Sequence, residues 1–140
     1  MLLSGQEIPL YFSMRNYPKR KNQYNHKKME TAFIKALRHI LSDKYSSVLV
    51  ADRGFGNERF IQLCLAHGFE IMIRMAPNVA IKTGEKQGIV EEVLTDDGVD
   101  ECSVRAWKKA HRVVRHRHEG QVWYVLTNLS EITDVQAAEV

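Results

Sequence analysis

The chain has only two cysteines in 140 residues, Cys64 and Cys102. They have neither the close spacing of a zinc site nor the density of a disulfide scaffold, so we expect two buried, reduced thiols. No apolar run approaches the ~20 residues needed to cross a bilayer. The segment Met1–Gly5 lacks the basic lead and long apolar core of a signal peptide. These absences predict a soluble, cytoplasmic protein with no membrane partner.

The sequence also lacks internal repeats and low-complexity segments. With 140 residues and 44% hydrophobic content, it can bury one core but not those of two ordinary domains. The formal net charge of +3 permits an anionic partner without requiring one. Basic residues gather in the first third and over 105–117, just after an acidic block over 91–101.

The stretch Ser46–Gly56 is the most informative, because it places a carboxylate where a strand ends. The apolar run Val48–Val50 is typical of a strand covered on both faces, and Asp52 follows it. Asn57 is a predicted N-cap for a helix that ends at Gly68. Ligands gather at the carboxyl ends of strands in open α/β sheets, so Asp52 is a candidate metal-binding or catalytic acid. The alternative is a carboxylate that only caps the turn.

Three further elements complete an α/β half. Apolar residues recur at helical spacing over Met29–Leu41, which predicts an amphipathic helix whose apolar stripe packs in the core. Ile8–Met14 is predicted to be an edge or early strand, because Pro9 cannot donate a hydrogen bond to a central ladder. Phe69–Met75 reads as a strand, and the helix before it is long enough to connect it in parallel to Val48–Asp52 by a right-handed crossover.

Beyond Pro77 the pattern changes to short runs of the kind found in antiparallel strands, with Glu119-Gly120 as a hairpin turn. These runs are I-V-E-E-V-L, C-S-V-R-A-W, H-R-V-V-R-H-R-H and V-W-Y-V-L. The predicted fold class is therefore α/β, a mixed sheet with helices followed by a β-rich segment.

Four motifs, in their order and rough spacing, resemble those of DDE-type insertion-sequence transposases of group four. They are G-x-x-I-P-L-Y-F at Gly5–Phe12, V-L-V-A-D-R-G-F-G at Val48–Gly56, F-x-I-M-I-R-M at Phe69–Met75 and W-Y-V-L-T-N-L at Trp123–Leu129. The resemblance covers nearly the whole chain. It implies a partial RNase H-like core over 1–76, a β-rich insertion over 77–129 and the truncated start of a C-terminal helix over 130–140.

The resemblance also implies a chemistry. Such enzymes cleave and join DNA at transposon ends with two divalent ions, Mg²⁺ or Mn²⁺, held by three acids, because paired ions can clamp the in-line phosphoryl centre. Asp52 matches the second of these acids, as a catalytic residue and metal ligand. Arg53 is a candidate phosphate contact, or else part of an ion pair that orients the turn.

Two parts of the family pattern have no counterpart in the sequence. The first acid of the family lies upstream of the segment that matches Gly5–Phe12, and the third lies in a Tyr…Arg…Glu…Lys signature after the strand that ends here at Leu129. Glu131 and Glu139 are outside any such signature. The chain therefore resembles an internal fragment of a transposase, which we expect to be inactive alone.

Basic side chains that could neutralise DNA phosphates form the predicted contact surface, with a merely solvated basic face as the alternative. They are Arg53, Arg74, Lys108, Lys109, Arg112 and Arg115. His111, His116 and His118 could be considered a zinc cluster, but alternating Arg and His on a solvated strand is the commoner arrangement.

Two hypotheses of function remain open. One is a piece of a bacterial, nucleoid-associated transposase whose partners are DNA and other transposase subunits. The other is a non-catalytic DNA-binding module, either a relic or a regulator of the full-length enzyme.

Overall fold

A computed structural model of the chain describes residues 26–41, 46–104 and 110–130. The chain separates into two compact units, Met1–Tyr45 and Ser46–Val140, and each is considered by itself. The predicted strand over Ile8–Met14 and the predicted helix start over 131–140 lie outside the described residues.

In the first unit, helix α1 (His26–Ile40) confirms the helix predicted from apolar spacing. Its last turn is basic, and the guanidinium of Arg38 donates to the Leu41 carbonyl at 2.9 Å, which satisfies one of the unpaired carbonyls at the helix end. The predicted core stripe is only partly right. The predicted stripe consisted of Met29, Ala32, Phe33, Ala36, Leu37, Ile40 and Leu41. Ile34, which is outside that set, is buried, whereas Ile40 is 46% exposed.

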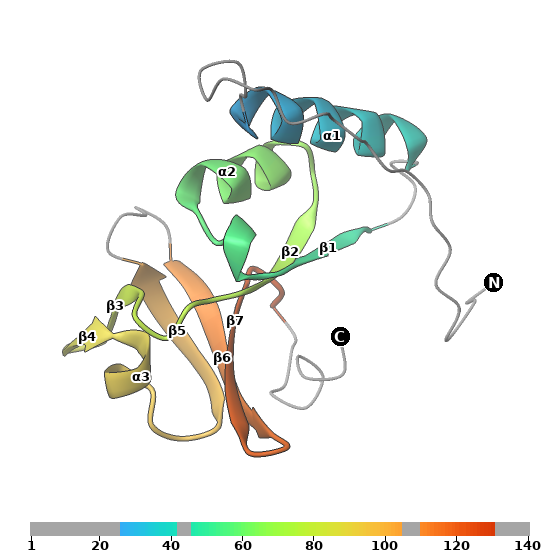
Figure 1. Cartoon of the computed structure of the whole chain (residues 1–140). Helices are drawn as coiled ribbons and strands as arrows, with labels where there is room; N and C mark the ends of the chain where they lie inside the picture. Colours follow the sequence, from blue (N-terminus) through green and yellow to red (C-terminus); the bar gives the residue numbers. More distant parts are fainter. Residues whose placement is uncertain (1–25, 42–45, 105–109, 131–140) are drawn as a thin grey trace, which may run out of the picture. The chain divides into compact units, whose positions relative to one another are not determined.

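The second unit is a mixed α/β structure built on one seven-stranded sheet of order β1-β2-β7-β6-β5-β3-β4 (Figure 1). Its strands are β1 (Val48–Ala51), β2 (Glu70–Arg74), β3 (Ala80–Thr83), β4 (Lys86–Ile89), β5 (Gly98–Val104), β6 (Ala110–His118) and β7 (Gln121–Thr127). Its helices are α2 (Glu58–Ala66) and α3 (Val90–Val93), with a short 3₁₀ turn over Arg53–Phe55. No helix in the described ranges is long and apolar enough to span a membrane.

Strands β1 and β2 are parallel neighbours joined through α2, which confirms the predicted strand–helix–strand unit. The side chain of Asn57 caps α2 by accepting from the Phe60 amide at 3.0 Å. The helix ends just before Gly68, whose φ of 75° suits glycine. The buried side chains Phe60, Ile61 and Cys64 form the apolar face of α2, which lies against β2.

The prediction that β1 is covered on both faces is wrong. Val48 is 42% exposed and Val50 is 53% exposed, while the residues between and after them are half-buried. The apolar run predicted two buried faces because it contains no polar alternation. In the described part of the chain, however, β1 pairs with β2 alone and forms one edge of the sheet.

Strand β7 joins the two parts of the sheet, since it pairs antiparallel with β2 on one side and with β6 on the other. The buried Thr127 hydroxyl donates to the Ile71 carbonyl at 2.7 Å, and the Ile71 amide donates to Asn128 at 2.8 Å. These bonds tie the end of β7 to β2. The side chains of Met72, Val114 and Val125 then pack together across β2, β6 and β7.

The β-rich segment forms largely as predicted. Glu119 and Gly120, with φ of 47° and 77°, make the turn between β6 and β7, which confirms the hairpin. The run over 89–94 is different, because after Ile89 it forms the single-turn helix α3 rather than a strand. Cys64 and Cys102 are both buried, as expected, and the structure shows no disulfide bond at either.

Candidate functional site

Asp52 lies directly after β1, at the carboxyl end of the parallel β1–β2 pair. Its carboxylate is exposed, and Oδ1 accepts from the Arg53 amide at 2.7 Å. The turn-capping role considered from the sequence is therefore present. It does not exclude a ligand role, because an ionised carboxylate offers two oxygens with several acceptor positions.

The turn after Asp52 is tightly closed against the end of β2. The Phe55 amide donates to the Asp52 carbonyl at 2.9 Å, and the Gly56 amide donates to the Arg53 carbonyl at 3.1 Å. A Cβ atom added at Gly56 would lie 3.3 Å from the Arg53 carbonyl oxygen and 3.5 Å from that of Arg74. Because Gly56 has no side chain, the turn can approach the end of β2 closely.

A pocket of about 330 Å³ lies beside Asp52 on one face of β1, β2 and β7. Its lining residues are Val50, Ala51, Asp52, Met72, Arg74, Trp123 and Val125. The guanidinium carbon of Arg74 is 4.0 Å from the centre of the Trp123 ring. The pocket therefore combines one carboxylate, one aromatic-backed cation and a buried apolar base formed by Met72 and Val125.

This arrangement can hold a small anionic group against Arg74 and can present one oxygen ligand from Asp52 to a hard cation. In the described segments, no group of three or more His, Cys, Asp or Glu side chains could hold a metal ion. Asp52 alone fits one coordination position of Mg²⁺, so a complete two-ion centre needs carboxylates from elsewhere.

The other predicted DNA-contact residues lie in different surroundings. Arg53 is exposed beside Asp52, and its guanidinium forms no ion pair with any residue that the structure describes, so the ion-pair alternative has no support there. Arg74 lines the pocket. Lys108 and Lys109 lie outside the described residues.

Arg112 and Arg115 are both occupied by protein groups. Arg112 donates to the Leu129 carbonyl at 3.0 Å and to the Ser130 carbonyl, and lies 3.5 Å from the Glu101 carboxylate. Arg115 pairs with Asp97, and its side chain is only 10% exposed. The four candidates that the structure describes, Arg53, Arg74, Arg112 and Arg115, therefore do not form one solvated basic face.

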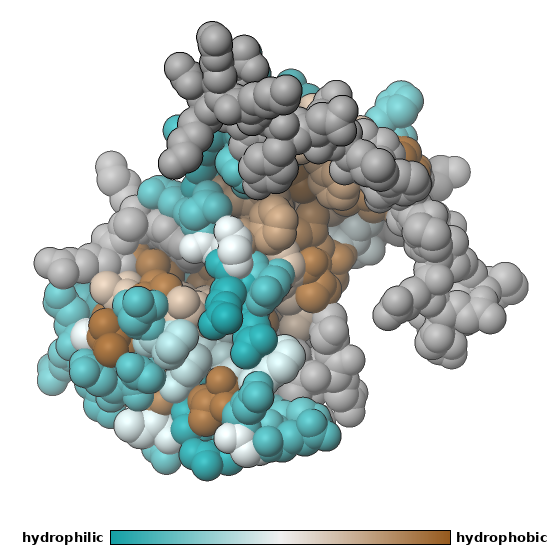
Figure 2. All heavy atoms as spheres, viewed as in Figure 1, coloured by the Kyte–Doolittle hydropathy of each residue, from teal (hydrophilic) through white to brown (hydrophobic). Residues whose placement is uncertain are grey.

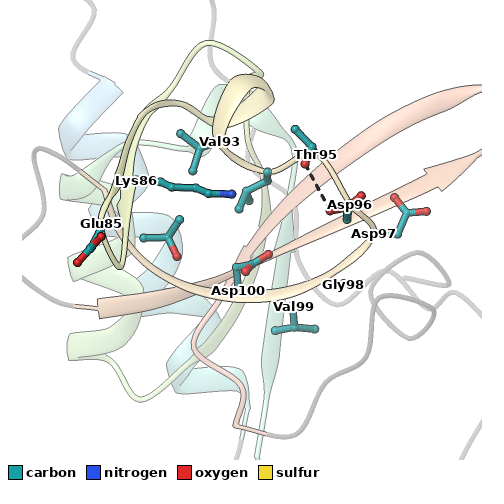
Figure 3. Close-up of a pocket in the computed structure, with 11 residues that line it drawn as sticks. Glu85, Lys86, Val93, Thr95, Asp96, Asp97, Gly98, Val99 and Asp100 are labelled. Carbon is teal, nitrogen blue, oxygen red and sulfur yellow. Dashed lines mark hydrogen bonds between the residues drawn. The ribbon is translucent and has the colours of Figure 1, made fainter.

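A second pocket, of about 600 Å³, lies between the β3–β4 hairpin, α3 and the start of β5. Figure 3 shows Lys86 extending between acidic residues that include Glu85, Asp96 and Asp100. The Thr95 hydroxyl donates to Asp96 at 3.4 Å. Hydrophilic residues predominate around β3, β4 and α3 in the view of Figure 2. Because its acids outnumber its single lysine, this pocket disfavours phosphate groups.

The three candidate histidines do not form a cluster. His111 is buried in β6, and the alternation of the strand places it on the face opposite to His116 and His118. Cys102 is also no candidate nucleophile. Burial, and then the charge of Asp100, raise the pKa of its thiol to about 12, so it stays protonated near neutral pH.

The sequence reasoning missed Trp123 as the partner of Arg74. The turn at Glu119-Gly120 sets the register of β7 against β6, so the β6 neighbour of Trp123 could be predicted from the sequence. The pairing of β7 with β2 had no such local signal, because residues 75–120 separate the two strands in the chain.

No protein-family model matches the chain, and no curated protein matches it significantly.

Proposed function

We propose that this chain carries part of the catalytic domain of a DDE-type DNA transposase, with an RNase H-like arrangement around β1 and β2. The observation that carries the proposal is the position of Asp52 at the carboxyl end of the parallel β1–β2 pair, beside a pocket lined by Arg74. An acid at this end of parallel strands is well placed to bind a ligand. The proposal also rests on the sequence motifs that resemble the family.

In this proposal Asp52 supplies one carboxylate ligand to a divalent ion, Mg²⁺ or Mn²⁺, which polarises the phosphoryl group and generates the nucleophile when it is bound. The two further acids come from outside the described residues or from another polypeptide. Arg74, steadied by Trp123, holds a DNA phosphate near that carboxylate. Arg53, exposed at the same turn, provides a second phosphate contact.

The metal step is testable on the 140-residue chain itself. Mn²⁺ added to isotope-labelled protein should broaden the backbone NMR signals of Arg53–Gly56 before others, because paramagnetic broadening falls steeply with distance. Asp52→Asn should remove this effect while leaving the spectrum otherwise native. Asp96→Asn, which neutralises an exposed acid in the other pocket, is the matched control. It should leave the broadening at Arg53–Gly56 unchanged.

The catalytic step needs a protein in which this chain is joined to segments that supply the two other acids. There, Asp52→Asn should abolish Mg²⁺-dependent DNA cleavage and leave DNA binding largely intact, since the substitution removes a ligand and hardly changes shape. Cleavage at a near-normal rate would leave turn capping as the role of Asp52. DNA binding with no metal or Asp52 dependence of any reaction would favour the non-catalytic, regulatory module instead.

A further inference from the structure

Helix α1, the blue helix of Figure 1, carries a row of exposed residues along one side. The row, which we call the α1 stripe, consists of Lys28, Ala32, Lys35 and His39. Their spacing of i, i+4, i+7 and i+11 keeps them on one face of an α-helix. Two lysines are thus held on a rigid element, and the small side chain of Ala32 between them leaves both ammonium groups accessible.

The apolar side of the same helix is largely covered. Ile34 is fully buried, and Phe33 and Leu37 are half-buried, whereas Ile40 in the last turn is 46% exposed. Binding of an amphipathic helix to a lipid surface grows with the apolar area that it can insert. One exposed isoleucine at the helix end offers little such area, so the α1 stripe favours a polyanion in water over a membrane.

The helix dipole does not account for the lysines at the start of α1. Lys27 and Lys28 lie in the first turn, which contains no acid, although the dipole favours acids and disfavours cations there. Only the basic residues of the last turn, Arg38 and His39, suit the dipole. Both lysines of the first turn are exposed. An exposed lysine has three N–H donors, so one that contacts a neighbour within the chain can still bind a phosphate.

We propose that the α1 stripe, together with the adjacent Lys27, binds the phosphate backbone of duplex DNA. From Lys28 to His39 the stripe is about 16 Å long at 1.5 Å per residue. Over that length one strand of duplex DNA carries roughly five phosphates.

The contact should not depend on DNA sequence. Lysine neutralises phosphates as a compact charge, and the α1 stripe contains no Asn, Gln or Arg to read base edges. The inference rests on the proposed function for the identity of the polyanion as DNA. The position of the surface, however, does not depend on the roles proposed for Asp52 and Arg74.

The test is the salt dependence of binding to two labelled duplexes of unrelated sequence, measured by fluorescence anisotropy on the 140-residue chain. The double variant Lys28→Ala, Lys35→Ala should lower the slope of log affinity against log salt concentration by about 2 for both duplexes, roughly 1 per lost phosphate contact. Alanine favours the helix, so α1 should persist, and circular dichroism checks this. The matched control is Lys82→Ala, Lys86→Ala, which removes the same charge from exposed positions of β3 and β4 and should keep the slope of the unaltered chain.

The outcomes separate this inference from the proposed function. A lower slope in the α1 variant but not in Arg74→Ala would support the α1 stripe and remove the phosphate contact proposed for the pocket. The reverse result would overturn the inference and leave that contact in place. Equal loss of slope in the two double variants would also overturn it, because net charge alone would then explain the binding.

Two further results would overturn the inference. One is an unaltered chain that binds neither duplex at low salt, in which case the Mn²⁺ test of Asp52 still decides the proposed function separately. The other is an α1 variant with an unchanged DNA slope that no longer binds vesicles of phosphatidylserine and phosphatidylcholine, which would assign the α1 stripe to a membrane surface.

Discussion

The guanidinium of Arg74 lies over the indole of Trp123, with 4.0 Å between the guanidinium carbon and the ring centre. The two residues come from β2 and β7, which pair antiparallel, and both line the pocket beside Asp52. A cation within about 6 Å of an aromatic face is attracted to the ring electrons. The contact therefore holds a positive charge at the wall of the pocket that Asp52 also lines.

Arg74→Ala should weaken binding to duplex DNA equally for all sequences. A single phosphate contact carries no sequence information, and its loss should lower the slope of log affinity against log salt by about 1. Fluorescence anisotropy with a labelled duplex at several salt concentrations measures both. Lys86→Ala is the control, because Lys86 lies among acids that disfavour DNA, and its slope should match that of the unaltered chain. A DNA affinity that does not change with salt concentration would contradict the proposed phosphate contacts.

Arg115→Met should destabilise the fold, because it leaves Asp97 without its partner. Asp97 is 40% exposed and can regain water, so we expect a loss of about 1–3 kcal/mol rather than the full penalty of a buried charge. Urea unfolding monitored by circular dichroism gives this value. Glu101→Gln, which removes a 77% exposed partner of Arg112, should change stability by less than about 1 kcal/mol. Equal effects of the two substitutions would show that burial of Arg115 does not matter.

Asn57→Ala should lower the free energy of unfolding by about 1 kcal/mol, because it removes the acceptor for the Phe60 amide at the start of α2. Asn57→Asp keeps an acceptor at the same place and should restore most of the stability. Thermal unfolding of the three proteins compares them directly. An alanine variant as stable as the parent would mean that water replaces the cap without loss.

Stability should fall between pH 9.0 and about pH 12 because of Cys102. The pKa of its thiol is raised from 9.0 to about 12 by burial and then by Asp100. In that pH range the folded thiol keeps a proton that the unfolded one releases, so unfolding is favoured as pH rises. Below pH 9.0 both states are protonated and the effect vanishes. Urea titrations of the parent and of Cys102→Ala should show a steeper alkaline decline in the parent.

Local signals in the sequence were enough to predict the elements around Asp52. The apolar run before it, the capping side chain of Asn57 and the glycine after α2 all act within a few residues, so the parallel β1–β2 pair followed from them. The hairpin at Glu119-Gly120 was predictable for the same reason. The β1–β2 pair, the cap of α2 and this hairpin are thus local predictions that the structure confirms.

Longer-range relationships could not be read in this way. Nothing near Arg115 indicates that Asp97, on the loop before β5, neutralises it, so a basic run looked like a solvated surface. The exposure of Val50 depends on which strands lie beside β1, and an apolar run does not specify its neighbours. The proposed metal-binding role of Asp52 also depends on residues distant in sequence, because it needs further acids whose positions no local sequence pattern predicts.

The position of β7 between β2 and β6 has a consequence for synthesis on the ribosome. Strand β2 emerges early, but its second neighbour, β7, is the last in sequence among the strands that the structure describes. Until Thr127 and Asn128 leave the exit tunnel, the Ile71 amide and carbonyl lack the partners that they have in the finished protein. A nascent chain in which β1 and β2 are already paired therefore has an open edge at β2, which other strands and chaperones can contact until β7 closes the sheet.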